Sequence, residues 1–333
     1  MGHTVFGLYR RRADNQQPPR LRWMSDYNID LTHHGLIPGD ITDYYSVIQF
    51  LKKSEPDIIF HLASQSFVPE SMNNPLATYD ATWHGTLNIL EAMRNVCPNH
   101  TKLIFASSSE CYGMQFDTQL DYTNYVREHG NTFCAPLGYP ETPIDEDNIM
   151  RPQSPYAVAK LASDYACRNY YQTYGLKTVV ARPFNVEGAG RGHHFVTASI
   201  VRQLVEYSIG ERDTIHVGNT ASRRDWSHVD DVVDGYILLA LEARVGEVYV
   251  MGSGRQYSIA EFIQMVSDEL GVDSLGDVYV NDSLKRKTDV TNLVADASKI
   301  RRLGWSPKKD IKDIIKDLIH FYIVPSHRKN ILE

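Results

Sequence analysis

Residues 103–113 read LIFASSSECYG, and this stretch decides the fold class. Residues 103–106 are a short apolar run of the kind found in buried strands, and a polar run follows directly at 107–113. In doubly wound sheets, ligands bind beyond the carboxyl ends of the parallel strands. The hydroxyls of Ser108 and Ser109 and the carboxylate of Glu110 are therefore predicted to lie where chemistry takes place.

Strand and helix patterns alternate on both sides of this stretch. Strands are expected at residues 3–9, 58–62 and 178–181, and helices at residues 42–53, 75–94 and 154–174. This alternation predicts an α/β fold, a Rossmann-like doubly wound parallel sheet with helices on both faces. Further along, short strands mix with helices in what reads as a smaller mixed α/β lobe. We expect a first domain over residues 1–181, to which segments near 213–245 return, and the second lobe over residues 182–333.

The composition argues against several classes of protein. Hydrophobic residues make up 42% of the 333 residues and charged residues 23%, which is ordinary for a globular chain. No apolar run approaches the roughly 20 residues that span a bilayer, and residues 1–12 hold no apolar stretch of a secretory signal. The net charge of −7 argues against a role in coating nucleic acid. The 4 cysteines lie far apart without a CxxC pair, which is typical of free thiols in a reducing cytosol.

A second motif, Tyr156-Ala157-Val158-Ala159-Lys160, lies in the helix expected at 154–174. Residues four apart share one helix face, so the phenol and the ammonium are expected to be neighbours. A neighbouring ammonium favours the phenolate and lowers its pKa, which suits a tyrosine that acts as a base near neutral pH. The pattern alone is weak, since a buried tyrosine beside a snorkelling lysine gives the same spacing. It gains weight from the Ser108–Glu110 turn about 45 residues before it.

Together these motifs make the sequence resemble the extended short-chain dehydrogenase/reductases that act on nucleotide sugars. Within them it is most similar to the GDP-mannose 4,6-dehydratases and the related keto-sugar reductases. The resemblance covers nearly the whole chain, through blocks at residues 61–66, 108–113, 154–160, 182–185, 191–197, 224–226, 286–290 and 303–307. It implies that the first domain binds a dinucleotide and that the second lobe mainly binds substrate.

The resemblance also assigns catalytic roles. Tyr156 is implied as the base at the sugar 4-hydroxyl, and Lys160 as the residue that holds the nicotinamide ribose. Ser108 stands where the dehydratases usually have Thr and polarises the C4 oxygen. Glu110 matches the carboxylate that removes the C5 proton, a step that dehydration needs and that a reductase or an epimerase does without. Glu110 therefore favours a dehydratase, although some reductases also carry an acid here.

The cofactor prediction depends on the end of the first expected strand. There the chain reads Tyr9-Arg10-Arg11-Arg12, with no acid before Asp14. An acid at this point is typical of NAD sites and a basic residue of NADP sites, so Arg10 and Arg11 favour NADP, with NAD as the alternative. Further cofactor contacts are implied by the resemblance for five residues, namely Asp40, Ile41, Leu62, Ala63 and Ser64.

The substrate ligands are implied by the resemblance as well. Arginine suits a diphosphate because its planar fork can bind two oxygens. The implied set consists of Ser109, Asn185, Arg224, Arg286 and Asp289, and the last stands where the family usually has Glu. His193 and His194 are adjacent and have no third ligand at a suitable spacing, so no metal is expected.

Two departures from the family pattern stand out. The sequence has no GxxGxxG turn, whose backbone N–H groups cradle a pyrophosphate, and residues 2–7 match the start of the family's second strand. We expect a start site placed too late, or else a truncation that binds nucleotide poorly, and in either case exposed apolar neighbours. The second departure is residues 116–139, a long polar stretch where relatives are shorter. Its tyrosines and Cys134 suit either a sugar pocket or a subunit contact.

Three hypotheses for function remain open from the sequence. The first is an NADP-dependent lyase that converts GDP-mannose to its 4-keto-6-deoxy product, and the second is a reductase or epimerase of a related nucleotide sugar. The third is an impaired enzyme that only binds nucleotide sugar. The resemblance implies a cytoplasmic protein without nucleic-acid or membrane partners, in a deoxysugar pathway. Because Arg191 matches a position that reaches a neighbouring subunit's cofactor, a homodimer or homotetramer is expected.

Overall fold

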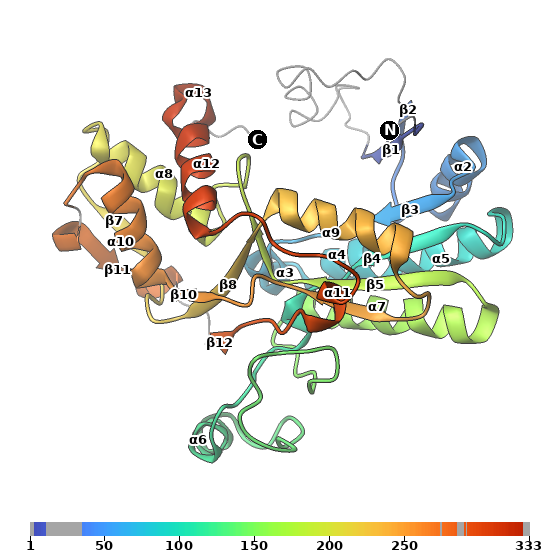
Figure 1. Ribbon diagram of the computed structural model, residues 1–333, viewed down its shortest axis with the longest axis horizontal. Helices are drawn as coiled ribbons and strands as arrows, with labels where there is room; N and C mark the ends of the chain where they lie inside the picture. Colours follow the sequence, from blue (N-terminus) through green and yellow to red (C-terminus); the bar gives the residue numbers. More distant parts are fainter. Residues whose placement is uncertain (1–2, 11–34, 274, 285–289, 291, 329–333) are drawn as a thin grey trace.

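The computed structural model of the protein describes residues 3–10, 35–273, 275–284, 290 and 292–328. Its centre is a four-stranded parallel sheet (Figure 1). The strands, in spatial order, are β3 (Ile58–His61), β4 (Lys102–Ala106), β5 (Lys177–Pro183) and β9 (Val248–Met251). The predicted Rossmann-like α/β class is confirmed.

Helices cover both faces of this sheet. On one face the apolar cluster around Leu103, Phe105 and Val180 includes residues of α2 (Tyr44–Ser54), α5 (Gly85–Val96) and α7 (Pro155–Tyr174). On the other face Ile104, Val179 and Ala181 pack with α9 (Val229–Glu242) and α11 (Ser298–Arg301). Consecutive strand residues thus point to opposite layers, which is why the strands read as continuous apolar runs.

The helix α7 follows directly from its sequence. The Ser154 side chain accepts a hydrogen bond from the Ala157 backbone N–H, Pro155 occupies the first turn, and Gly175 ends the helix with φ 72°. The helix expected at 75–94 is interrupted instead. It consists of α4 (Pro75–Tyr79), the π-helical turn η1 (Asp80–His84) and α5.

Two side-chain hydrogen bonds meet at the Thr82 carbonyl within the interruption. This oxygen accepts hydrogen bonds from the hydroxyls of Thr86, at 2.6 Å, and Ser163, at 3.2 Å. Two side-chain donors compete there with the backbone ladder, which is typical of a widened turn. The spacing of apolar residues, from which a continuous helix was predicted, does not reveal such competition for a carbonyl.

A separate two-stranded parallel sheet pairs β1 (Phe6–Tyr9) with β2 (Gly35–Pro38). Within the described residues, neither β1 nor β3 has a strand on its second edge. Ile58 and Phe60 of β3 are 36% and 43% exposed, and their register with β4 places them on the face that α9 covers further along. The expected exposure of apolar neighbours is therefore confirmed.

The second lobe is built around β8 (Arg223–His228). This strand pairs with β10 (Gln256–Ser258), β12 (Asn292–Leu293) and β6 (Asn185–Glu187), and nearby β7 (Ile215–Val217) pairs with β11 (Val278–Val280). The core holds Trp226 and Phe262 and is covered by α8 (Val196–Ser208), α10 (Ile259–Leu270) and α12 (Ile311–Ile323). Short elements complete the chain: α3 (Val68–Asn73), η2 (Ser109–Cys111), η3 (Leu275–Asp277), η4 (Asp282–Leu284) and α13 (Pro325–Arg328). The domain boundary at 181/182 stays a prediction.

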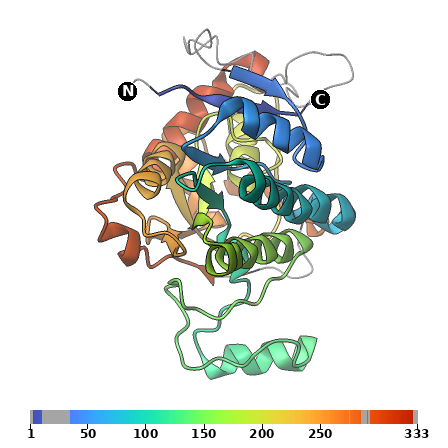
Figure 2. The same cartoon turned by 90° about the vertical axis from the view of Figure 1, so that its right-hand side faces the viewer.

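Residues 114–150, called the arm below, leave the body in part, whereas Ile144 stays buried in the core with Phe184 and Val250. The arm carries α6 (Gln119–His129), none of whose residues is buried, and the helix lies apart from the sheet in Figures 1 and 2. A helix replaces part of the long loop expected at 116–139. Thr118 and Asp121 form a capping box at its start, which is a readable sequence signal. None of the described helices has both the length and the apolar character needed to cross a membrane.

Candidate active site

The predicted catalytic residues converge where β4 ends. Ser108, Ser109 and Glu110 form the turn that follows this strand, while Tyr156 and Lys160 project from the first two turns of α7. Lys160 reaches the end of β4, since its Nζ donates to the Ala106 carbonyl at 2.6 Å. Two segments about 45 residues apart in sequence therefore meet at one site.

The Tyr156 phenol is buried and shares a hydrogen bond with the Ser108 side chain. Burial raises the pKa of Tyr156 well above its ordinary value, and the Ser108 bond and the Arg191 charge oppose this in part. The expectation that Lys160 lowers this pKa is wrong for the described geometry. The Lys160 ammonium lies 6.0 Å from the Tyr156 ring centroid and is bound to a carbonyl instead.

Lys160 sits in an environment that disfavours its charge. Burial lowers the pKa of Lys160 to about 8. Burial, together with the nearby Lys160 charge, lowers the pKa of His61 to about 3, and the His61 Nε2 lies 2.9 Å from the Thr86 hydroxyl. His61 is therefore neutral near pH 7, and Lys160 is the ionisable group beside it.

Glu110 is half-buried at the rim of the same turn. Its backbone N–H donates to the Ser108 hydroxyl at 3.2 Å. Its charge contributes to the raised pKa of Tyr156, after burial, so the carboxylate and the phenol act on one another. A carboxylate and a phenol close together can address adjacent carbons of one bound sugar.

The residues predicted for the cofactor lie at two places. Arg10 and Asp40 follow β1 and β2 and form an ion pair of 3.2 Å, with Arg10 85% exposed. Leu62 and Ala63 are exposed just after β3, and Ser64 bonds to the Gln65 carbonyl at 2.9 Å.

The polar groups at these two places fit the two ends of an NAD(P) dinucleotide. Gln65 Oε1, beside Ser64, is buried and has no hydrogen-bond partner among the described residues, so a ligand hydroxyl or amide would satisfy it. Lys160 and Tyr156 would hold the nicotinamide ribose, and the exposed Arg10 would face a 2′-phosphate. Ile41 differs from this pattern, because its side chain packs toward α5 with the core around Leu103.

The structure also brings two predicted substrate residues together. Asn185 on β6 donates to the Asp225 carbonyl on β8 at 3.1 Å, and Arg224 is the preceding residue of β8. Ser109 is buried in the β4 turn. Arg11, Arg286 and Asp289 lie outside the described residues, so their predicted roles stay predictions. The described residues contain no group of three or more His, Cys, Asp or Glu placed to hold a metal ion.

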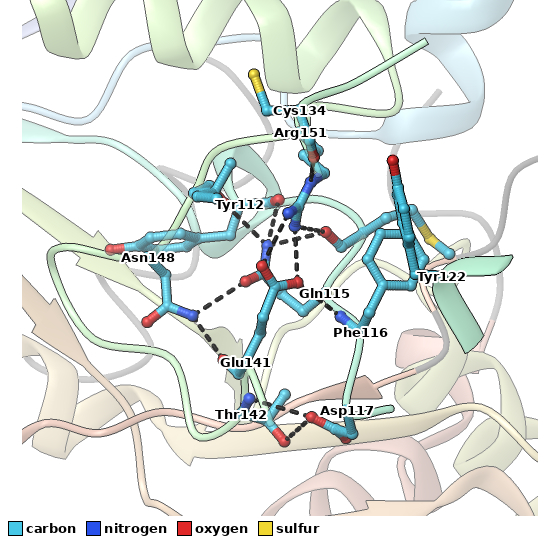
Figure 3. A network of polar contacts seen from close by, with 12 residues as sticks. Tyr112, Gln115, Phe116, Asp117, Tyr122, Cys134, Glu141, Thr142, Asn148 and Arg151 are labelled. Carbon is cyan, nitrogen blue, oxygen red and sulfur yellow. Dashed lines mark hydrogen bonds and ion pairs between the residues drawn. The ribbon is translucent and has the colours of Figure 1, made fainter. Parts of the chain in front are cut away.

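The base of the arm adjoins this site, and Figure 3 shows the contacts that close it. Arg151 is fully buried and donates to both Glu141 oxygens at 2.8 Å, and to the carbonyls of Met114 and Cys134 at 2.9 Å each. Arg151 also bridges to Gly113, three residues after Glu110. Arg151 therefore fixes the base of the arm between the Glu110 turn and the start of α7.

Arg191, which the resemblance assigned to a neighbouring subunit's cofactor, also contributes to the site of its own chain. Its charge acts on Tyr156 of its own chain, and its Nε lies 3.4 Å from Glu187 Oε2. Thr197 donates to the same Glu187 oxygen at 2.6 Å, and the Arg191 guanidinium lies 3.5 Å from the Phe195 ring centroid. The four-residue spacing of Glu187 and Arg191 at the end of β6 is the sequence signal that could have predicted this ion pair.

Fold and site together define an extended short-chain dehydrogenase/reductase: a parallel α/β sheet with Ser108, Tyr156 and Lys160 at the carboxyl end of a central strand. The model of the NAD dependent epimerase/dehydratase family matches residues 1–252. The chain belongs to that family.

Individual relatives extend the comparison. The chain is 30% identical to a GDP-mannose 4,6-dehydratase of Vibrio cholerae, over 96% of this chain and 87% of the relative. It is 30% identical to GDP-mannose 4,6 dehydratase 2 of Caenorhabditis elegans, over 96% and 82%. Among solved structures it resembles RMD from Pseudomonas aeruginosa complexed with NADPH, with a TM-score of 0.75, 25% identity, and coverage of 96% and 98%.

Proposed function

We propose that this protein is an NADP-dependent nucleotide-sugar 4,6-dehydratase that converts GDP-mannose to GDP-4-keto-6-deoxymannose. The observation that carries the proposal is the position of Glu110. It shares one turn with Ser108 and lies within electrostatic reach of Tyr156, as the extra base of a dehydratase must. The curated relatives that bear this activity in their names support the substrate class.

The residues act in the following way. When bound, NADP would accept a hydride from C4 and return it to C6 after water is lost, so that the cofactor would end unchanged. Tyr156 takes the proton of the C4 hydroxyl, while the Ser108 hydroxyl donates a hydrogen bond to the C4 oxygen. The C4 ketone makes the C5 proton acidic. Glu110 removes that proton and passes it to the C6 hydroxyl, which leaves as water while a C5–C6 double bond forms. Lys160 binds the nicotinamide ribose, while the Ser108 hydrogen bond and the Arg191 charge favour the deprotonated phenol.

Substrate selection is assigned to the second lobe. Asn185 on β6 donates to the carbonyl of Asp225, the residue after Arg224 on the neighbouring strand β8, and this amide and guanidinium suit a nucleoside diphosphate. The GDP base and the mannose epimer rest on the relatives alone. A cytoplasmic location, a homodimer or homotetramer, and a role in deoxysugar supply are proposed from the sequence alone.

Incubation with GDP-mannose, with and without added NADP, tests the proposal. A 4-keto-6-deoxy product formed without net consumption of cofactor is the expected result. Stoichiometric oxidation of NADPH with a keto-sugar would instead indicate a reductase. A protein that binds nucleotide sugar but no dinucleotide would be a binding protein, and the proposal would fail.

The variant Glu110→Gln isolates the elimination step. We expect water loss to fall by about 100-fold or more, since general base catalysis contributes roughly 10²–10⁴. Oxidation at C4, followed as transient NADPH absorbance, should persist. Glu128→Gln is the matched control, because the Glu128 side chain is 76% exposed on α6 and should leave both steps unchanged. Water loss at the wild-type rate in Glu110→Gln would remove Glu110 from the mechanism.

A further inference from the structure

A fully buried ion pair joins α7 to β5 directly behind the active site. Asp164 and Arg182 are both 0% exposed. Arg182 Nε lies 2.8 Å from Asp164 Oδ2, and Arg182 Nη2 lies 3.1 Å from Asp164 Oδ1. This bidentate arrangement fixes the orientation of both side chains, because the planar guanidinium matches the carboxylate edge.

The pair also holds both ends of the turn that carries Ser108 and Glu110. At the start of the turn, the Ser107 hydroxyl donates to Asp164 Oδ2 at 3.0 Å. At its end, Arg182 Nη1 donates to the Tyr112 hydroxyl at 2.8 Å. The intervening backbone therefore has one charged anchor at each end.

The same carboxylate is tied to the helix that carries the other two catalytic residues. Asp164 follows Lys160 by four residues and Tyr156 by eight, so all three lie along one face of α7. Arg168, one turn further, lies 3.0 Å from Asp164 Oδ1. The ion pair thus links the strand, the helix and the turn that together form the site.

We infer that Asp164 and Arg182, acting through Ser107 and Tyr112, are positioning residues that set Ser108 and Glu110 against Tyr156. The inference rests on the proposed dehydratase function for its catalytic meaning. A buried ion pair adds little net stability compared with apolar side chains of the same shape, because both charges lose their hydration. The pair instead fixes the orientation of its own two side chains and of the Ser107 and Tyr112 hydroxyls. Proton transfer at C4 and C5 requires such a pre-organised geometry.

The pair itself is a poor target for mutation, since removal of one partner leaves a buried charge uncompensated. The double variant Ser107→Ala/Tyr112→Phe leaves the ion pair intact and releases both ends of the turn. Thr178→Val is the matched control. Thr178 is also fully buried, and its hydroxyl donates at 2.7 Å to the Cys167 carbonyl of α7, at the opposite end of β5 from the active site.

In the double variant we expect kcat for GDP-mannose to fall by about 10-fold to 100-fold, the cost of small misplacement of reacting groups. KM and the Kd for NADP should stay within about twofold, since the substrate and cofactor contacts are untouched. The control should lose thermal stability to a similar degree while keeping kcat. An equal fall of kcat in both, or a loss confined to KM, would overturn the positioning role.

Hydrogen–deuterium exchange separates this inference from the proposed function. The amides of Cys111, Tyr112 and Gly113 donate within the turn, at 3.0–3.2 Å, and report its rigidity without any substrate. Relative to wild type, we expect amide exchange over residues 107–113 to be about tenfold faster in the double variant and unchanged in Thr178→Val. If the double variant exchanges faster but the wild-type protein is inactive on GDP-mannose, the proposed function is refuted and the positioning role is kept. Unchanged exchange would refute the positioning whatever the activity.

Discussion

The variant Glu141→Gln tests how the arm is held, and its effect can be worked out from the contacts. The side chains of Arg151 and Glu141 are only 1% and 8% exposed, and the two are joined by two hydrogen bonds of 2.8 Å. Glutamine keeps the shape and one acceptor oxygen, but its amide group faces a donor of Arg151 and leaves that charge uncompensated. Breaking a buried pair costs about 3–5 kcal/mol, and the retained acceptor favours the lower end.

That free energy converts to a melting temperature. Unfolding entropy near about 2.1 cal/mol/K per residue gives roughly 0.7 kcal/mol/K for a chain of this size, so about 3 kcal/mol lowers Tm by about 4 °C. Scanning calorimetry measures this shift, and limited proteolysis over residues 114–150 reports whether the arm is released before the body unfolds. Glu128→Gln, on the exposed face of α6, serves as the control. A Tm within about 1 °C of wild type, with unchanged cleavage of the arm, would refute the conclusion that the Arg151–Glu141 pair holds the arm.

Three further predictions concern the fold around the site. Burial lowers the folded-state pKa of His61 from 6.5 to about 3, so between these pH values the unfolded chain binds a proton that the folded chain does not. Between pH 7 and pH 5 the wild-type protein should therefore lose about 2 kcal/mol more stability than His61→Gln, as measured by urea unfolding. Equal losses in the two proteins would contradict this. Phe60→Ala should cost under about 1 kcal/mol, as Phe60 is 43% exposed, whereas Phe105→Ala, at 1% exposed, should cost about 3–5 kcal/mol in the same assay; similar costs would count against the exposure of β3. Gly113→Ala should lower Tm by more than Glu141→Gln does, because an added Cβ would lie 1.7 Å from the Arg151 carbonyl at φ +55°, and a mild effect on Tm would show that this bridge is not formed.

The catalytic turn and helix could be predicted from sequence because their signals are local. Residues 103–106 form a strand within one residue of expectation, and the Tyr156–Lys160 helix begins and ends at its Ser154 and Gly175 caps. The meeting of the two segments followed from the rule that parallel strands place their carboxyl ends at one edge. These predictions needed only patterns within about 20 residues.

Other features depend on contacts between distant segments. The raised pKa of Tyr156 comes first from burial, which no spacing reveals, so the expected help from Lys160 was misplaced. The π-turn at Asp80–His84 depends on Ser163, about 80 residues away. The Asp164 anchor was readable in part, since it continues the four-residue spacing of Tyr156 and Lys160, but its partner Arg182 lies on another element.

The two ends of the proposed dinucleotide site belong to different sheets. Lys160 and Tyr156 stand over the four-stranded sheet, whereas Arg10 and Asp40 follow β1 and β2. No strand pairing within the described residues joins these sheets, so the distance between the two ends is set by side chains. The two sheets are connected through the packing of α2 on α5, which share an apolar cluster. Beside this cluster the Asn88 amide donates a hydrogen bond to the Ile41 carbonyl at 2.9 Å. Because side-chain packing yields more readily than a hydrogen-bonded ladder, cofactor affinity in this protein should depend on α2 and α5 far more than kcat does.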